Sequence, residues 1–205
     1  MSEQTKMLSG KLYDASDEDL AALRLTAHKI NHEYNETFED EVEKRKALLA
    51  KLVPKMGSGA YLQSPIHFDY GVFTEIGDRF FSNFNLTILD TCPVKIGNDV
   101  FLGPNITIAT PMHPLRFQER NQQVNAKGQL YDYEYGKSIT IGDNCWLASN
   151  VIVTAGVHIG EGCVIGAGSV VTKDIPANYL AFGNPCRPIR EITDQDRLEL
   201  QGKTI

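Results

Sequence analysis

Several features that would place a chain in a specialised class of protein are scarce or absent here. Four cysteines in 205 residues, without a Cys-x-x-Cys pair, argue for free thiols and against a disulfide framework. No apolar run approaches the roughly 18 residues that can span a bilayer, and the polar N-terminus lacks the apolar core of a signal peptide. We therefore expect a cytoplasmic protein with no membrane partner.

Positive charge is also in deficit. The sequence has 20 Lys and Arg residues against 26 Asp and Glu residues, a formal net charge of -6. Nucleic-acid binding requires a basic surface to meet phosphates, so this class of partner is not expected. The 42% hydrophobic and 22% charged residues are typical of a globular domain with its own core.

The most informative feature that is present is a period of six residues. Six consecutive hexads run from residue 141 to 176, and each opens on an aliphatic residue: Ile141, Leu147, Val153, Ile159, Ile165 and Val171. A strict period of six fits neither a helix nor an ordinary strand. It repeats one short strand and one tight turn, and stacked repeats bury a continuous apolar ladder. The pattern predicts a mainly β chain that forms a parallel β-helix.

The same register extends upstream, with two interruptions. It appears at Ile96, Leu102 and Ile108, and more loosely at Ile76, Ser82 and Ile88. A two-residue slip separates Ile88 from Ile96, and the polar stretch 111–137 has no hydrophobic period. A long loop without secondary structure of its own is more often functional than accidental, so we expect 111–137 to leave the solenoid and wall a site.

The predicted organisation has three parts: an N-terminal helical segment (1–58), the β-helix with its excursion loop (59–182) and a C-terminal tail (183–205). In the first part, Ser16 and Asp19 predict the start of an amphipathic helix with apolar residues spaced three and four apart. A second helix is predicted to begin at Thr37, with Asp40, and to stop at Pro54. We expect both helices to cover the open end of the first coil.

The positions of two cysteines in the repeat predict how they lie in the coil. Cys145 and Cys163 share the fifth hexad position and lie three hexads apart. If three hexads make one triangular coil, these residues stack directly above one another. We interpret them as small core residues, because no Cys/His spacing typical of a metal site accompanies them.

Two groups of residues carry chemistry. His113 lies in Thr-Pro-Met-His-Pro, where the hexads give way to the polar loop. An imidazole is suited to take a proton near neutral pH, although a histidine between prolines is often only a turn residue. The second group is a cluster of cations in an acidic protein, at Lys173, Arg187 and Arg190. It fits either an ordinary solvated face or a ligand with several phosphates.

Together, these motifs resemble the maltose and galactoside O-acetyltransferases. The resemblance rests on the hexads together with Gly10–Tyr13, Asn83-Phe84-Asn85, His113-Pro114, Ile165–Ser169, Val171–Asp174 and Gly183–Arg187. It covers nearly the whole chain, and the set in this order is far more specific than any single hexad. It implies a left-handed β-helix, acetyl-CoA as the donor and a homotrimer with active sites between subunits.

The resemblance also implies roles for single residues. His113 matches the general base, and Asn83 matches an asparagine that stabilises the transition state, by holding either the acceptor or the oxyanion. Asp69 falls at an acceptor-binding position, and Glu134 lies in the loop near the acceptor. Positions that bind coenzyme A are matched by Ser149, Ala167, Thr172, Lys173, Arg187 and Arg190. No metal is expected, and no cysteine lies in the catalytic motif, so we expect direct transfer without an acetyl-enzyme.

Three departures bear on the acceptor. Galactoside-type members carry aspartates where this chain has Ala15 and Thr91, and a serine where it has Asp69. A site built around hydrogen bonds to hydroxyls discriminates strongly by them, so the departures favour a maltose-like or glucosyl acceptor.

Three alternatives stay open from the sequence. One is an antibiotic or serine acceptor, and another is a non-catalytic scaffold. The third is a zinc carbonic anhydrase on the same fold, which would use three histidines such as His67, His113 and His158.

Overall fold

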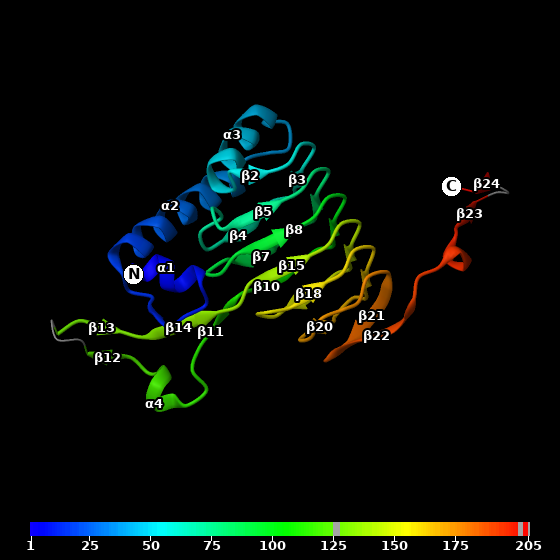
Figure 1. Cartoon of the computed structure of the whole chain (residues 1–205). Helices are drawn as coiled ribbons and strands as arrows, with labels where there is room; N and C mark the ends of the chain where they lie inside the picture. Colours follow the sequence, from blue (N-terminus) through cyan, green and yellow to red (C-terminus); the bar gives the residue numbers. More distant parts are fainter. Residues whose placement is uncertain (125–127, 201–202, 205) are drawn as a thin grey trace.

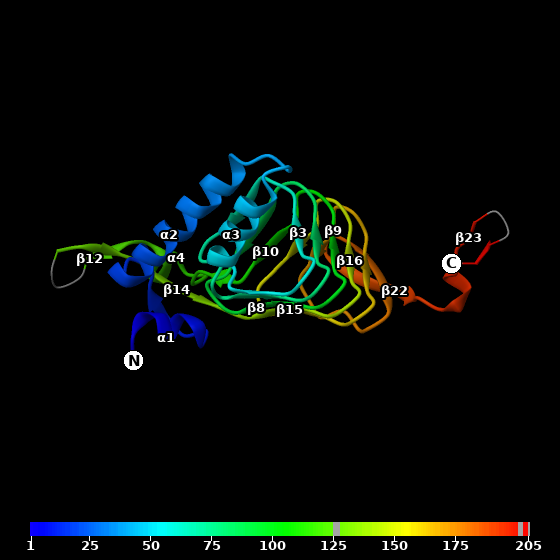
Figure 2. The same ribbon diagram turned by 90° about the horizontal axis from the view of Figure 1, so that it is seen from above.

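The central part of the computed structural model is a solenoid whose coils stack along one axis (Figure 1), and the residues it describes are 1–124, 128–200 and 203–204. Parts of the predicted loop (125–127) and of the predicted tail (201–202 and 205) lie outside the described residues. Each coil contributes one short strand to each of three parallel sheets, and the coils enclose the core (Figure 2). The predicted parallel solenoid is therefore confirmed.

The strands of the three sheets follow one another around each coil. The first sheet holds β2 (Lys55–Met56), β5 (Thr74–Ile76), β8 (Val94–Ile96), β15 (Ile139–Ile141) and β18 (His158–Ile159). The second holds β3 (Tyr61–Leu62), β6 (Phe81–Ser82), β9 (Phe101–Leu102), β16 (Trp146–Leu147), β19 (Val164–Ile165), β21 (Tyr179–Gly183) and β22 (Cys186–Glu191). The third holds β4 (Ile66–Phe68), β7 (Leu86–Leu89), β10 (Thr107–Ala109), β17 (Ile152–Val153) and β20 (Val170–Val171).

The hexad register matches the observed pairing. Ile141 pairs with Ile159, and the other hexad-opening residues pair in the same way one coil apart. All six of these aliphatic side chains are buried. Cys145 and Cys163 are also buried and free, and they precede the paired residues Trp146 and Val164. Their predicted stacking in the core is confirmed.

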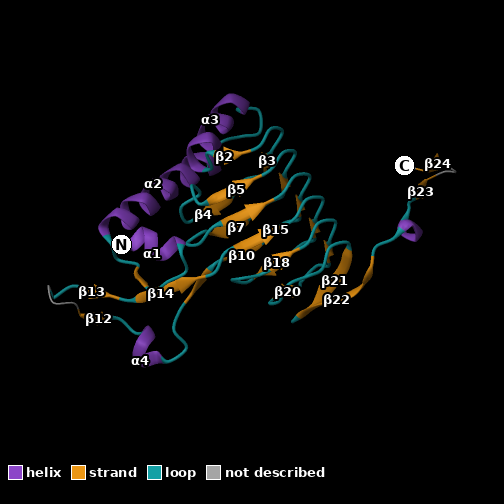
Figure 3. Cartoon of the chain, viewed as in Figure 1, coloured by secondary structure: helices purple, strands orange, loops and turns teal. Residues whose placement is uncertain are grey.

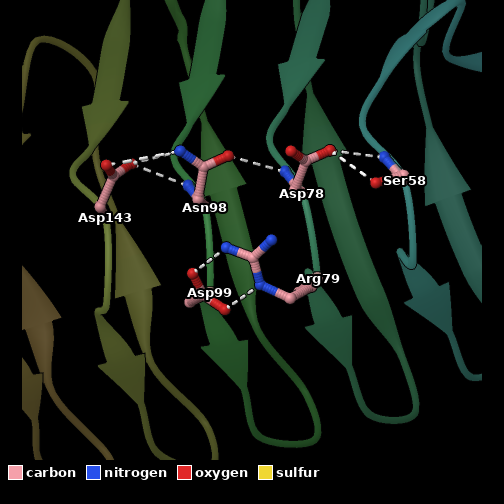
Figure 4. Close-up of polar contacts among 6 residues, drawn as sticks. All are labelled: Ser58, Asp78, Arg79, Asn98, Asp99 and Asp143. Carbon is pink, nitrogen blue, oxygen red and sulfur yellow. Dashed lines mark hydrogen bonds and ion pairs between the residues drawn. The ribbon is translucent and has the colours of Figure 1, made fainter.

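Side chains at one corner link the coils to each other (Figure 4). Asp78 accepts a hydrogen bond from the Ser58 N–H at 2.6 Å, Asn98 accepts from the Asp78 N–H at 2.8 Å, and Asp143 accepts from the Asn98 N–H at 2.8 Å. Just before Asp78, a Cβ on Gly77 would lie 2.7 Å from the Asn98 nitrogen. Only glycine permits such close stacking of the backbone.

Another corner, which joins the third sheet to the first, is irregular in the first three coils. From Phe68 to Ile76 and from Ile88 to Ile96 the chain takes eight residues between buried positions, whereas Val153 to Ile159 takes six. In the third coil the whole excursion loop leaves from this corner. We call these segments (69–73, 90–93 and 110–138) the irregular corner. The sequence indicated the second and third breaks, and the structure adds the first.

Three helices precede the solenoid and lie at its N-terminal end (Figure 3): α1 (Glu3–Leu8), α2 (Glu18–Asn35) and α3 (Val42–Leu52). The predicted cap of α2 at Ser16 was wrong, because Asp17 is the residue that accepts from the Leu20 N–H. The predicted start at Thr37 was also wrong, since Thr37 bonds back to the carbonyl of Tyr34 and α3 begins at Val42. Helix α1, capped by Ser2, was not predicted.

The helices cover the first coil, as expected. Strand β4 is the edge of its sheet, and two asparagines of α2 bond its backbone as a neighbouring strand would. Asn31 donates to the Phe68 carbonyl (2.7 Å) and accepts from the Phe68 N–H (3.3 Å). Asn35 makes the same pair of bonds with Ile66, at 2.9 and 2.8 Å. The exposed edge is thus satisfied by side chains one helical turn apart.

The excursion loop does have secondary structure, and the expectation that it has none was wrong. It contains β11 (Pro111–Met112), α4 (Phe117–Arg120), β12 (Gln123–Val124), β13 (Leu130–Tyr131) and β14 (Tyr133–Gly136). Strand β14 lies between β11 and β1 (Tyr13–Asp14), antiparallel to both. The polar sequence hides this pairing because each partner is only two residues long. The loop projects beyond the helices (Figure 1).

The chain leaves the last coil through the antiparallel pair β21 and β22. A short 3-10 helix (Asp194–Asp196), β23 (Glu199–Leu200) and β24 (Lys203–Thr204) follow and lead away from the solenoid (Figure 1). At the N-terminal end of the solenoid, the first strand, β2, begins at Lys55, which is four residues before the predicted domain boundary at residue 59. No helix among the described residues has both the length and the hydropathy to cross a membrane.

Candidate active site

A pocket of about 450 Å³ lies at the irregular corner. We call it the corner pocket. Its walls come from the segment between α1 and α2, from α2 itself, from the two eight-residue turns and from the end of the excursion loop. The lining residues are Tyr13, Ala15, Ser16, Arg24, His28, Asp69, Tyr70, Thr91, Asp132 and Glu134. The breaks in the hexad register therefore form one polar cavity.

His113 stands beside this pocket, directly after β11. Its side chain is 47% exposed, and its Nε2 lies 4.0 Å from Oε1 of Glu134. Glu134 faces Tyr13 across the β1–β14 pair and accepts a 2.7 Å hydrogen bond from the Tyr13 hydroxyl. Burial and this hydrogen bond raise the pKa of Tyr13, so the phenol stays protonated as the donor. The second carboxylate oxygen of Glu134 is thus aimed at the imidazole.

Asp69 forms the opposite wall. Its side chain is 25% exposed, and Oδ1 lies 3.7 Å from Nε2 of His28. Burial raises the pKa of Asp69, while His28 and Arg24 act against that shift. The buried Asp90 holds the turn that carries Asp69, because its Oδ1 accepts from the Tyr70 N–H at 2.8 Å.

Arg24 is a pocket residue that sequence reasoning missed. It lies on the face of α2 that turns toward the pocket, where Nη1 donates to the Tyr70 hydroxyl (2.7 Å) and Nη2 to the Ala15 carbonyl (3.1 Å). The available signal was an arginine beside the apolar stripe of a predicted helix, one turn after Leu20. Arginine presents a planar set of donors that suits hydroxyl or carboxylate oxygens.

Asn83 is not in the corner pocket. It lies between β6 and β7, at the corner that joins the second sheet to the third. Its Oδ1 accepts from the Phe84 N–H at 2.8 Å, which leaves the amide NH₂ as the group it presents. The four residues of β7 separate this corner from the irregular corner by about 13 Å, at roughly 3.3 Å per residue. One chain therefore does not bring Asn83 and His113 to the same atom.

The predicted coenzyme A residues also occupy separate places. Ser149 and Ala167 lie at the same corner as Asn83, whereas Thr172 and Lys173 follow β20 at the opposite end of the third sheet. Arg187 and Arg190 are exposed on β22. Arg190 is bound to Asp196 at 2.6 Å and, with the Thr193 N–H, lowers the pKa of that carboxyl to about 2.

One group of side chains near the corner pocket could hold a metal ion. Among the described residues, His113, Asp132 and Glu134 are the set of three whose ligand atoms lie within 4.8 Å of one another. This set overlaps the proposed base, and a metal on the imidazole would prevent it from taking a proton. The histidines of the carbonic anhydrase alternative are scattered: His67 lies on β4, and His158 lies on β18, four coils further along and in another sheet.

Comparison with known proteins adds an independent line of evidence. Residues 6–57 match the maltose acetyltransferase hexapeptide capping motif, and residues 138–173 match the bacterial transferase hexapeptide repeat. Galactoside O-acetyltransferase of Escherichia coli (strain K12) is 41% identical over 94% of this chain and 90% of its own length.

Two solved structures are similar over nearly the whole fold. A maltose O-acetyltransferase from Clostridium difficile 630 is 45% identical, with a TM-score of 0.88 and coverage of 95% of this chain and 99% of its own. A galactoside acetyltransferase in complex with coenzyme A is 39% identical, with a TM-score of 0.89 and coverage of 100% and 98%. The predicted left-handed parallel β-helix is confirmed by these matches.

The fold and the comparisons thus define a hexapeptide-repeat acetyltransferase. Within that class, the chain belongs to the maltose and galactoside O-acetyltransferase family, as the sequence motifs predicted.

Proposed function

We propose that the protein transfers the acetyl group of acetyl-CoA to a hydroxyl of a sugar, and that the corner pocket holds the acceptor. The observation that carries the proposal is the corner pocket itself, in which His28, three carboxylates and an arginine line a cavity of about 450 Å³ with His113 beside Glu134. Hydroxyl-rich ligands need such a lining, because each hydroxyl both donates and accepts. Relatives are named for sugar acceptors, and one of them, a galactoside acetyltransferase, was solved in complex with coenzyme A.

In the proposed reaction, His113 removes the proton from the sugar hydroxyl as its oxygen attacks the thioester carbonyl. The bond from carbon to sulfur then breaks, and coenzyme A leaves as the thiol after taking up the proton. Glu134 faces the imidazole at 4.0 Å and stabilises the positive charge that it gains. Since a thioester is already activated, the enzyme supplies mainly a base, correct positioning and a donor for the oxyanion.

Asn83 is proposed as that oxyanion donor. Its Oδ1 is engaged by the Phe84 N–H, so the group it offers is the amide NH₂. A donor can stabilise the negative charge that develops on the carbonyl oxygen, whereas holding a hydroxyl proton would require the oxygen. This geometry favours the oxyanion role over the acceptor role.

The separation of Asn83 from His113 supports active sites shared between subunits of a homotrimer. If the corner with Asn83, Ser149 and Ala167 of one subunit faces the irregular corner of the next, both groups meet one substrate. Lys173 and Thr172 would then reach the same coenzyme A from the second subunit. Lys173 and Arg187 are exposed to solvent and can meet phosphates, whereas Arg190 is paired with Asp196.

Two finer points belong to this proposal. The carboxylate of Asp69, with Ala15 and Thr91 in place of acidic residues, favours a maltose-like or glucosyl acceptor over a galactoside. A cytoplasmic location is proposed because all four cysteines are free and buried, as in proteins from a reducing compartment.

The test is coenzyme A release from acetyl-CoA with a panel of acceptors: maltose, glucose, galactosides, serine and chloramphenicol. The proposal expects turnover with maltose or glucose above the rate of hydrolysis, and weaker turnover with galactosides. Turnover of serine or chloramphenicol alone would overturn the sugar assignment. Failure of acetyl-CoA to bind at all would support the non-catalytic alternative.

A further inference from the structure

A second pocket of about 320 Å³ adjoins the corner pocket. Both pockets are lined by His28 and Asp69, so the pair formed by these two side chains is the wall between them. The remaining walls come from α2, from β4 and from Leu89 at the end of β7. We call this cavity the histidine pocket, because three of its lining residues are His28, His32 and His67.

Apart from the carboxylate of Asp69, the polar groups that this pocket offers are its imidazoles. The amides of Asn31 and Asn35 also line it, but both are committed to the backbone of β4. His28 and His32 are one turn apart on α2 and exposed. His67 is exposed on β4 between the buried Ile66 and Phe68, so it faces outward into the pocket from the other side.

The chemistry of this lining fits hydroxyl groups better than a metal. His28, His32 and His67 do not form one of the converging ligand sets found among the described residues. A neutral imidazole presents one donor and one acceptor, as a hydroxyl does. Asp69 can accept from a hydroxyl in either pocket, because it borders both. Leu89 adds apolar surface for the C–H face of a ring.

We infer that the histidine pocket is a second acceptor subsite, which takes the sugar ring next to the ring that is acetylated. The inference rests on the proposed function and extends it: the acceptor is a disaccharide or longer, with the reacting ring in the corner pocket beside His113. Asp69 and His28 contact both rings at their junction, while His32 and His67 contact only the second ring.

The test compares a monosaccharide with its disaccharide, using His32→Ala and His67→Ala. The matched control is His158→Ala, because His158 is an exposed histidine on a strand outside both pockets. Initial rates of coenzyme A release are measured with glucose and maltose, and with methyl galactoside and lactose. Thermal melting verifies that each variant is folded.

We expect wild type to have the higher kcat/KM with the disaccharide of the preferred series. Each pocket variant should lose about 3- to 10-fold in kcat/KM for the disaccharide, the range of one or two neutral hydrogen bonds. The monosaccharide should stay within about twofold, and His158→Ala should match wild type with both acceptors.

Two results would overturn the subsite while leaving the proposed function intact. One is a wild type that acetylates the monosaccharide as well as the disaccharide, with variants that match it. The other is an equal loss on both acceptors, which would mean that the histidines only support the fold. A wild type that acetylates neither sugar would instead overturn the proposed function itself.

Discussion

Single residues of the proposed site, in the corner pocket and at the corner with Asn83, are held by hydrogen bonds that fix which group faces the substrate. Tyr13 occupies one oxygen of Glu134, Phe84 occupies the oxygen of Asn83, and Asp90 fixes the backbone at Tyr70. Each bond removes one orientation of a side chain that could otherwise rotate. The proposed base, His113, is by contrast nearly half exposed, as expected for a group that must meet two substrates.

The first prediction concerns His113. His113→Ala should lower turnover by roughly 10²- to 10⁴-fold, the usual contribution of a positioned acid or base. Affinity for acetyl-CoA, measured by titration calorimetry, should be unchanged, because the imidazole is needed for the proton and not for the donor. His158→Ala serves as the control and should keep full turnover. Near-normal activity of His113→Ala at neutral pH would remove the residue from its role.

The second prediction concerns the buried Asp90, whose pKa is raised by burial although the Tyr70 N–H, the Gly71 N–H and Thr74 act against that rise. A raised carboxyl pKa means that the folded state binds more protons than the unfolded state above the ordinary value. The stability contribution of Asp90 therefore falls as pH rises through that window. Asp90→Asn keeps an acceptor for the Tyr70 N–H and lacks the charge. Its stability should therefore not fall in this way as pH rises.

Urea unfolding at pH 5 and pH 8, at one protein concentration, measures this effect. The free energy of unfolding of Asp90→Asn relative to wild type should increase from pH 5 to pH 8. Asp90→Ala should be destabilised at both pH values by about 1–3 kcal/mol, because it leaves a buried N–H unsatisfied. A difference between Asp90→Asn and wild type that is constant with pH would show that Asp90 has an ordinary pKa.

At the scale of elements, the structure depends on how helices close the end of a solenoid. Helix α2 closes the end of the solenoid with asparagine side chains that bond the backbone of β4 as a strand would. Tyr34 of α2 and Arg45 of α3 both donate to the Leu62 carbonyl of the edge strand β3. Helix α2 also supplies Arg24 and His28 to the two pockets. One element thus caps the coil and walls the proposed acceptor site, so its position matters for both stability and specificity.

The third prediction tests this cap. Asn31→Ala removes the partners of both backbone groups of Phe68, and Asn31 is buried. The free energy of unfolding should fall by about 1–3 kcal/mol, the cost of unsatisfied buried groups. Asn35→Ala removes the equivalent bonds at a half-buried position and should cost less, because water can replace them. Equal and negligible effects in denaturant titrations would mean that the two asparagines do not stabilise the edge.

At the scale of the whole molecule, the two groups of residues proposed for one reaction lie at opposite ends of the third sheet. A closed ring of identical subunits can bring such surfaces together, since each subunit then presents one corner to each neighbour. Sedimentation at micromolar concentration should accordingly report about three chains per particle. A fully active monomer would contradict the shared site.

The fourth prediction tests the sharing directly by mixing two inactive variants. Asn83→Ala keeps His113, and His113→Ala keeps Asn83, so an interface between the two kinds of subunit can hold one complete site. Equal amounts, dissociated and reassembled, should regain about one quarter of wild-type activity in a randomly assorted cyclic trimer. The control is each variant taken alone through the same treatment. No recovery in the mixture would show that the two residues act within one chain or not at all.

Much of this architecture could be predicted from the sequence because the repeat is local. The hexads alone identified the parallel strands, their register and the stacking of Cys145 over Cys163, since every coil repeats the same six-residue rule. Helix α2 was also predictable from its apolar spacing, whereas its cap was misplaced by one residue. Capping depends on backbone geometry that Ser16 and Asp17 could equally adopt.

What only the tertiary structure decided is how the irregular segments meet. The strand β14 forms from a polar stretch because β1 and β11 lie on either side of it, and neither partner is near it in the sequence pattern. Arg24, Asp69 and Glu134 come together for the same reason, through contacts far apart in the chain. The sequence alone determined the repeat, because its energetics are local, whereas the pockets depend on long-range packing where the repeat is broken.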